Sequence, residues 1–337
     1  EGFPPNTIRR DTAGRALGVV EGGMGAVRAI AGKMPRVPDA EVEASSLAMI
    51  RDMNKSGLTA FGVAGCDDSL LAMYRKWRDQ NTLNVRVFCI DGAGAGTPEQ
   101  VDRALPRIAQ MPFFQGDSYI DQVFYGESVY GPLHDPMFDA TSDPKPDQLA
   151  QWRRIASEIA RVGRPLHVHA ELTHTIDAFL DQIEAINREH PIKGLRWTLA
   201  HFNQSNPAQM ERMKRLGMYA AVHPWNVING GIMREIFGDN ALEQPPLASI
   251  QASGLMWGFG SDGSAANQYM PFITLGWAVT GQMTSGLTVM RQTISREDAL
   301  IAYTRRNAFF VFQEDNLGRS EEHTSELQSR LHLVCRL

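Results

Sequence analysis

The fold is decided by the stretch Pro165–Leu166–His167–Val168–His169–Ala170–Glu171, which is short and apolar, carries histidines at its downstream end and is followed directly by a helix-like pattern. Two later stretches have the same build, Leu195–Arg196–Trp197–Thr198–Leu199–Ala200–His201 and Leu255–Met256–Trp257–Gly258–Phe259–Gly260–Ser261–Asp262. Each is predicted to be a buried strand whose last residue is suited to ligate a metal or to move a proton. Strands that deliver His, His and Asp at their C-terminal ends predict a (β/α) barrel, because that end of such a barrel carries the active site.

The rest of the chain alternates between strand-like and helix-like segments, which indicates an α/β fold with a mostly parallel sheet. The expected strands are 58–64, 84–90, 119–125, 165–171, 195–201, 218–223 and 255–261, and a closing helix is expected from Ser295. Before them, residues 8–20 are typical of a β-hairpin around an Asp-x-x-Gly turn, and a helix is expected from Ala40 to Gly57. Seven such strand–helix units leave an eight-stranded barrel one short, and the missing unit is expected at the start of the chain.

Composition and charge limit the kinds of molecule that the protein is expected to bind. The chain has 337 residues, a formal net charge of -5 and a pI near 6.0, which gives no electrostatic reason to expect nucleic acid or an anionic membrane as partner. No apolar run approaches the roughly 20 residues that a membrane helix needs. Cys66, Cys89 and Cys335 have neither metal-site nor disulfide spacing, so no disulfide framework is expected. Because no signal peptide follows Glu1, a cytoplasmic location is favoured.

The end of the chain is expected to be foreign to the fold. Residues 319–329, RSEEHTSELQS, resemble the translation of a common sequencing-library adapter, and 330–337 read as its continuation. The alternative is a natural amphipathic tail. No chemistry is therefore assigned to His323, His332 and Cys335.

The residues at the strand ends form a set with a defined chemistry. A catalytic zinc ion takes imidazole nitrogen and carboxylate oxygen and keeps one position open for water, which then loses its proton near neutral pH. A nearby carboxylate collects that proton and passes it to the leaving group. His169, His201 and Asp262 supply this set as candidate metal ligands, with Asp262 also the candidate proton carrier. A lone buried His is more often a hydrogen-bonded core residue, and an Asp after Gly-Ser is often a helix cap, but their common register favours the functional interpretation.

Two further histidines are open to more than one interpretation. His167 shares its strand with His169, and the His-x-His spacing suits two ligands of one metal. The alternative, slightly favoured, is that His167 packs inside the lower barrel. His223 ends its own predicted strand and is a candidate to polarise a substrate carbonyl or to orient water, with a structural role weighed evenly against this.

At these residues the sequence resembles the amidohydrolase superfamily, specifically its amidohydrolase-3 branch, from about Ile8 to Gly318. The motifs that carry the resemblance are the hairpin 8–20, Val168–His169–Ala170, Leu199–Ala200–His201, Gly260–Ser261–Asp262 and the segments within 297–318. The resemblance implies a distorted (β/α)8 barrel with a small β subdomain, and hydrolysis of N-acyl, formamide and related non-peptide C–N bonds in small molecules. It also implies one or two zinc or other divalent ions, with His169 and His201 as ligands and Asp262 as ligand and proton shuttle.

The sequence departs from the family pattern at three places. No His-x-His precedes residue 58 to end a first strand, and His167-x-His169 does not stand in for it, because the spacing to His201 and Asp262 suits strands five, six and eight. The fifth-strand motif continues with Glu171 in place of the usual Ile-Gly-Asp. Gln122 takes the place of the carbamylated Lys of two-metal members, and Glu127 is the candidate to compensate.

The expected organisation follows. Residues 1–39 are a β-hairpin and insert remnant, 40–318 an incomplete barrel holding strands two to eight, and 319–337 a non-native tail. The chain is therefore expected to be a fragment that holds zinc poorly and shows little or no turnover. The alternative from another class is a non-catalytic barrel that binds a ligand or partner, whereas a metal-free C–N hydrolase lacks a convincingly activated Ser or Lys.

Overall fold

The chain divides into two units, Glu1–Met49 and Ile50–Leu337, in a computed structural model that describes residues 7–20, 30–135, 143–263 and 266–319. In the first unit, β1 (Ile8–Arg10) pairs antiparallel with β2 (Ala16–Val20). The Asp11 carboxylate accepts hydrogen bonds of 2.9 Å from the backbone N–H groups of Ala13 and Arg15, and Gly14 has a φ of +79°. The predicted hairpin is confirmed. Its turn forms because Asp11 supplies the side-chain acceptor and Gly14 the positive φ that such a turn needs.

The helix α2 (Asp39–Lys55) contains the sequence boundary between the two units. It ends shortly before Gly57, whose φ is +106°. The predicted helix from Ala40 to Gly57 is confirmed within two residues at its end, where a glycine in this conformation commonly terminates a helix.

The second unit is built on a curled seven-stranded sheet in which the strands follow chain order and every neighbouring pair is parallel. Its strands are β3 (Ala60–Ala64), β4 (Arg86–Asp91), β5 (Ile120–Glu127), β6 (Leu166–Ala170), β7 (Thr198–His201), β8 (Tyr219–Val222) and β9 (Trp257–Phe259). Within the described ranges no strand pairs with the outer edge of β3 or of β9, so this sheet is open. The predicted α/β fold with seven parallel strands is confirmed.

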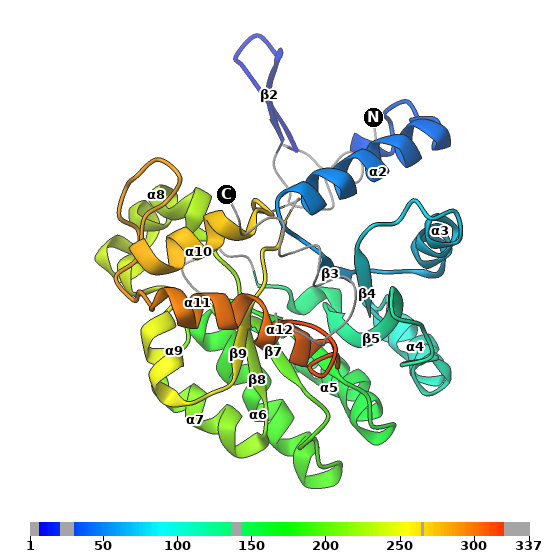
Figure 1. Cartoon of the computed structure of the whole chain (residues 1–337), viewed down its shortest axis with the longest axis vertical. Coiled ribbons are helices and arrows are strands. Elements are labelled where there is room, and N and C mark those ends of the chain that lie inside the picture. Colours follow the sequence, from blue (N-terminus) through cyan, green and yellow to red (C-terminus); the bar gives the residue numbers. More distant parts are fainter. Residues whose placement is uncertain (1–6, 21–29, 136–142, 264–265, 320–337) are drawn as a thin grey trace. The chain divides into compact units, whose positions relative to one another are not determined.

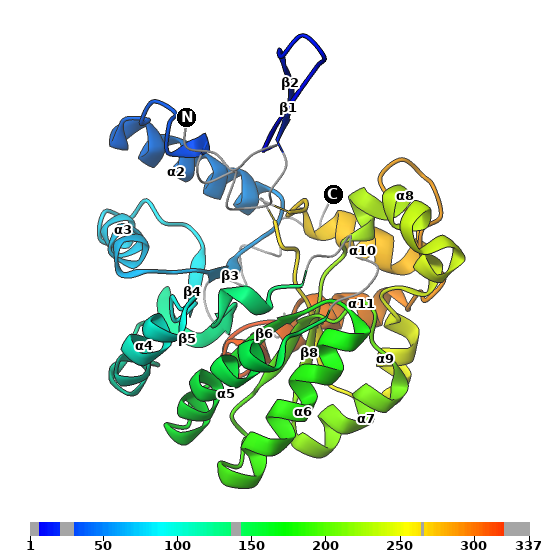
Figure 2. The ribbon, with the colours of Figure 1, turned by 180° about the vertical axis from the view of Figure 1, so that it is seen from behind.

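Helices connect successive strands, as parallel pairing requires. They are α3 (Asp68–Asp79), α4 (Pro98–Gln110), the 3₁₀ turn η1 (Gly131–Leu133), α5 (Pro146–Arg161), α6 (Thr173–Glu189), α7 (Pro207–Leu216), α8 (Asn226–Phe237), the 3₁₀ segment η2 (Gly238–Glu243) and α9 (Leu247–Ser253). Figures 1 and 2 show α4, α5, α6 and α7 following one another along the outer face of the sheet. Among the described residues, none of the helices is both long and apolar enough to span a bilayer.

The core lies between the sheet and these helices. Trp152 and Ile155 of α5 and Phe179 and Ile183 of α6 are each at most 2% exposed, and the Trp152 and Phe179 rings lie 4.8 Å apart. Their spacing places them on one face of each helix, and burial of each such side chain contributes about 2 kcal/mol. This packing holds the strands, and therefore their C-terminal ends, in fixed positions.

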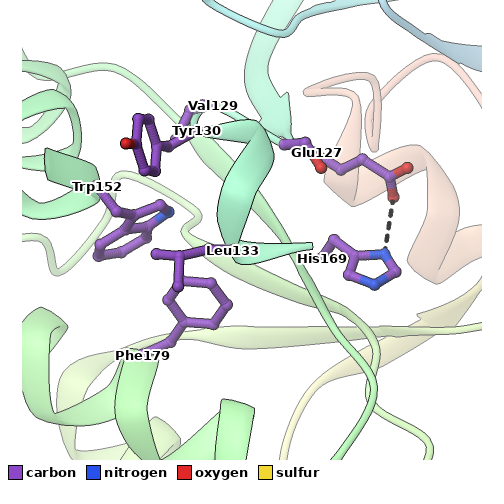
Figure 3. A pocket seen from close by; sticks show the side chains of 8 residues that line it. Glu127, Val129, Tyr130, Leu133, Trp152, His169 and Phe179 are labelled. Carbon is purple, nitrogen blue, oxygen red and sulfur yellow. Dashed lines mark ion pairs between the residues drawn. The ribbon is translucent and has the colours of Figure 1, made fainter. Parts of the chain in front are cut away.

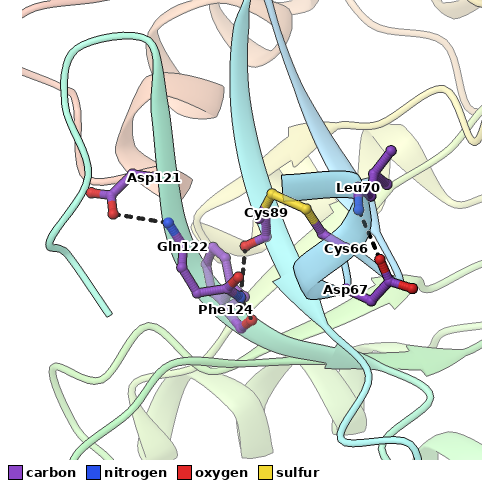
Figure 4. The surroundings of a disulfide bond; sticks show 7 residues. All are labelled: Cys66, Asp67, Leu70, Cys89, Asp121, Gln122 and Phe124. Carbon is purple, nitrogen blue, oxygen red and sulfur yellow. Dashed lines mark hydrogen bonds between the residues drawn. A yellow bond between two sulfur atoms is a disulfide. The ribbon is translucent and has the colours of Figure 1, made fainter. Parts of the chain in front are cut away.

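Cys66 and Cys89 form a disulfide, so the expectation of no disulfide was wrong (Figure 4). The backbone N–H of Cys66, just after β3, donates to the Ile90 carbonyl of β4 at 3.1 Å. The Cα atoms of Cys66 and Cys89 lie 5.4 Å apart. The 23-residue separation gave no disulfide signal in the sequence, because the strand–helix–strand connection alone makes the two positions neighbours.

After β9, the chain continues through α10 (Pro271–Thr280), α11 (Arg296–Tyr303) and α12 (Arg305–Phe310). Ser295 caps α11 by accepting a hydrogen bond of 3.0 Å from the backbone of Asp298. The closing helix was predicted as one element, but it breaks at Thr304, whose φ of -119° and ψ of -81° are not helical. The Asn307 amide of α12 donates to the Phe259 carbonyl at 2.7 Å, which fastens this segment to β9.

Candidate metal centre

Imidazoles from successive strands meet at one end of the sheet. His169 lies in β6, His201 ends β7 and pairs in register with Ala170, and His223 follows β8. The ring centroids are 4.4 Å apart for His169 and His201 and 4.3 Å apart for His201 and His223. The Nδ1 atoms of His201 and His223 are in hydrogen-bond contact. All these rings are buried, so the predicted convergence of His169 and His201 is present in the structure.

Two carboxylates complete the cluster. Glu127, the last residue of β5, places Oε2 2.9 Å from Nε2 of His201. The same oxygen lies 3.8 Å from Nδ1 of His169 (Figure 3). Glu171 is buried directly after β6, with Oε1 3.6 Å from Nδ1 of His201 and 3.8 Å from Nε2 of His223. Two groups of potential ligands result, Glu127–His169–His201 and Glu171–His201–His223, each with its ligand atoms within 4.8 Å of one another.

Three buried polar atoms in this cluster have no hydrogen-bond partner among the residues that the structure describes. They are Nδ1 of His169, Nε2 of His223 and Oε2 of Glu171. A buried polar atom without a partner costs free energy, and such atoms are expected where an ion or a substrate binds. Imidazole nitrogen and carboxylate oxygen are also the donor types that zinc and similar divalent cations prefer. The residues present therefore fit a divalent cation.

The charges of the cluster are strongly coupled. Burial acts to raise the pKa of Glu127, but its hydrogen bond with His201 and the charges of His201 and His169 lower it far more. Burial raises the pKa of Glu171 to about 7, against the lowering effect of His201 and His169. Burial also holds the pKa of His223 well below its usual value, with His201 and His169 adding to the shift. Glu127 is thus the carboxylate held most firmly in the anionic form that binds a cation.

Asp262 stands apart from both ligand groups. Desolvation of its carboxyl raises its pKa, and the charges of His201, Glu127 and His169 also act on it, so it lies within electrostatic range of the cluster although the residue as a whole is exposed. Its φ is +51°, a backbone conformation that favours Gly, Asn and Asp. Its predicted roles as ligand and proton carrier stay predictions.

Two other residues singled out in the sequence turn away from the cluster. His167 lies outside both ligand groups, and its ring packs edge-on against Phe124 at 5.9 Å. Burial lowers the pKa of His167 to about 4, so it is neutral near pH 7. The Gln122 amide donates to the carbonyls of Cys89 and Phe124 at 3.2 and 3.1 Å (Figure 4). Glu127 is the β5 residue that reaches the cluster.

The sequence did not identify Asp135 or His134 as parts of this centre. Asp135 is 2% exposed, and its Oδ1 lies 2.8 Å from Nε2 of His169. The His134 ring stacks on that of His169 at 3.7 Å. Both follow η1 in a loop rich in Gly, Pro and Asp, where no periodicity indicates which side chains turn inward.

Comparison of the sequence with models of protein families identifies the family of the chain. The model described as the amidohydrolase family matches residues 3–322, and the chain belongs to this family. A search of curated proteins by sequence finds no match.

Solved structures share the fold. An uncharacterized metal-dependent hydrolase from Pyrococcus horikoshii is similar with a TM-score of 0.68 and 20% identity, over 94% of this chain and 64% of that one. A triazine hydrolase variant is similar with a TM-score of 0.57 and 16% identity, over 96% of this chain and 69% of that one. A guanine deaminase from C. acetobutylicum with bound guanine is similar with a TM-score of 0.53 and 13% identity, over 84% of this chain and 67% of that one. The chain spans less than two thirds of the length of the Pyrococcus protein.

Proposed function

We propose that the chain is the catalytic part of a metal-dependent hydrolase that cleaves non-peptide C–N bonds of small molecules such as amides. One observation carries the proposal: the ligand atoms of Glu127, His169 and His201 lie within 4.8 Å of one another, and Nδ1 of His169 has no hydrogen-bond partner among the described residues. Family membership and the similarity to a triazine hydrolase and a guanine deaminase support the choice of C–N bonds.

In this proposal Glu127, His169 and His201 hold one divalent cation. The cation, when bound, acidifies water and polarises the bond to be cleaved. Zinc is the ion that we propose, because two imidazoles and a carboxylate are a donor set typical of catalytic zinc. We further propose Asp262 as a ligand to the same cation.

Asp262, His223 and Glu171 have the remaining roles, which are proton transfer, hydrogen bonding to the substrate and orientation of the imidazole rings. Asp262 would accept the proton of the attacking water as its oxygen bonds to the carbonyl carbon, and would transfer that proton to the leaving nitrogen as the C–N bond then breaks. The pKa of His223 is held well below its usual value, which favours the neutral ring, and a hydrogen on its buried Nε2 would donate a hydrogen bond to the substrate carbonyl. Glu171 lies against both His201 and His223 and orients them.

Hydrolysis by the zinc-loaded chain tests the proposal, with N-formyl and N-acetyl arylamines as substrates. Because the chain spans only part of the Pyrococcus protein, we expect slow turnover that requires zinc. Asp262→Asn should lower kcat, measured at saturating zinc, by at least about 100-fold because the amide cannot carry the proton, and it should also weaken zinc binding because an anionic ligand is lost. Ser261→Ala is the matched control next to it and should retain most of the turnover. Turnover that persists in Asp262→Asn or without any divalent metal would contradict this function.

A further inference from the structure

Asp135 is a buried carboxylate that joins the candidate ligand His169 to the start of a helix. Its Oδ1 lies 2.8 Å from Nε2 of His169, and its backbone carbonyl oxygen is also 2.8 Å from that nitrogen. Its carboxylate accepts hydrogen bonds from the backbone N–H of Glu171 at 3.2 Å and from that of Leu172 at 2.9 Å. Every one of these partners lies at or just after the end of β6.

These contacts decide which nitrogen of His169 carries a proton. Both acceptors at Nε2 are oxygen atoms, so Nε2 must donate and therefore keeps its hydrogen. The lone pair of the neutral ring is then on Nδ1. That atom is buried without a hydrogen-bond partner in the described part of the chain and lies 3.8 Å from Oε2 of Glu127, on the side where the candidate ligands converge.

The same loop also fixes the plane of the ring. His134, the residue before Asp135, stacks on His169 with 3.7 Å between centroids and 24° between planes. Its Nδ1 in turn hydrogen-bonds Oγ of Ser128 at 3.1 Å. The ring of His169 is thus held at its edge by Asp135 and on its face by His134.

Asp135 has a second effect on the backbone at this point. Leu172 occupies the N-cap position of α6 and offers no side-chain acceptor to the first turn of that helix. The Asp135 carboxylate, from a distant part of the chain, supplies an acceptor to the N–H groups of Glu171 and Leu172 in its place. Anionic acceptors are favourable at helix N-termini, which explains why a carboxylate is stable in this buried position.

We propose that Asp135 is a positioning residue that presents Nδ1 of His169 to a divalent cation by holding the proton and the orientation of the ring. The inference rests on the proposed function, because it needs a cation at Glu127, His169 and His201. Hydrogen bonds of this kind, from a ligand imidazole to a carboxylate, commonly change metal affinity by about 10- to 100-fold.

Zinc affinity, measured by competition with a chromophoric chelator on the whole chain, tests the proposal without any activity assay. Asp135→Asn keeps an oxygen for the helix N–H groups but loses the charge, so we expect binding about 10- to 100-fold weaker than wild type. Asp67→Asn is the matched control, because Asp67 caps α3 by accepting from Leu70 at 2.8 Å and takes no part in the cluster. It should bind zinc as wild type does. Equal affinities for wild type and Asp135→Asn would overturn the proposal.

The protonated nitrogen of His169 can also be identified by NMR in the wild type, so this test does not depend on the folding of a variant. In zinc-loaded protein with ¹⁵N-labelled histidine, long-range ¹H–¹⁵N spectra should show Nε2 of His169 protonated and Nδ1 without a proton. The reverse assignment would overturn the positioning role while leaving the metal site in place. Failure of the wild type to bind zinc at all would instead contradict the proposed function, so the two failures are distinguishable.

Discussion

Arg196→Ala removes a side chain that fastens the C-terminal segment to the start of β7. The guanidinium carbon lies 3.9 Å from the ring centroids of both Phe309 and Phe312. The same group donates to Glu314 through Nη1–Oε2 and Nη2–Oε1 hydrogen bonds of 3.1 and 2.6 Å, and it also donates to the Phe309 carbonyl. The Arg196 side chain is only 16% exposed, so these contacts are made largely out of water.

The expected loss is the sum of these contacts. Each cation–π contact contributes about 1 kcal/mol, and the ion pair to the partly exposed Glu314 contributes about 1 kcal/mol. Arg196→Ala should therefore lower the free energy of unfolding by about 3 kcal/mol and the Tm by about 6 °C. Arg196→Lys keeps the charge but loses the planar fork and the stacking, so it should lose about 2 kcal/mol. Urea unfolding followed by circular dichroism measures both.

The effect should also depend on pH. Burial acts to raise the pKa of Glu314, but its hydrogen bond and charge interaction with Arg196 lower it overall. A carboxyl with a lowered pKa in the folded state stabilises the fold above its unfolded pKa of about 4.3, and this stability is lost as the pH falls through the folded pKa. The difference between wild type and Arg196→Ala should therefore shrink below about pH 4. A difference under about 0.5 kcal/mol at pH 7 would refute the reasoning.

The remaining predictions concern packing and covalent structure. A Cβ at Gly230 of α8 would lie 2.4 Å from Cγ1 of Val289, so Gly230→Ala should destabilise the fold by about 1–3 kcal/mol in thermal unfolding. At the neighbouring Gly231, no atom of the described residues lies within 4 Å of such a Cβ, and Gly231→Ala should stabilise the fold by up to about 1 kcal/mol; equal effects of the two substitutions would contradict the Gly230 contact. Peptide mapping without reductant should recover Cys66 linked to Cys89, and reduction should cost about 3 kcal/mol of stability for a loop of this length. Free thiols at both positions would contradict this pairing.

The sequence predicts the sheet well because parallel strands are buried on both faces and alternate with amphipathic helices. The sequence is less informative about where a strand begins or a helix ends when a single residue leaves the regular backbone conformation. The stretch from Leu195 was expected to be strand, but Arg196 has a φ of +56° and β7 begins only at Thr198. The closing helix likewise breaks at Thr304, the first residue of the polar run 304–307 that lies between two apolar segments.

Some residues of the candidate site can also be identified from the sequence, and others cannot. His169, His201 and His223 are identified by sequence because each falls at or next to the end of a strand, and parallel strands bring these ends together. Glu171 was visible only as a departure from a family motif. Asp135 reaches His169 from a loop, and the carboxylate of Asp262 depends on the path of its own loop, so side-chain direction there follows from tertiary contacts rather than from a repeating pattern.

Equilibrium binding of Zn²⁺ to the metal-free chain, measured by calorimetry, tests the central claim most directly. We predict one bound ion per chain, with affinity at least about 100-fold weaker in His169→Ala and in His201→Ala. His174→Ala is the matched control, because His174 is exposed at the start of α6 and belongs to neither ligand group, and its zinc affinity should equal that of the wild type. Zinc binding that is unchanged in His169→Ala and His201→Ala, or absent from the wild type, would contradict the account.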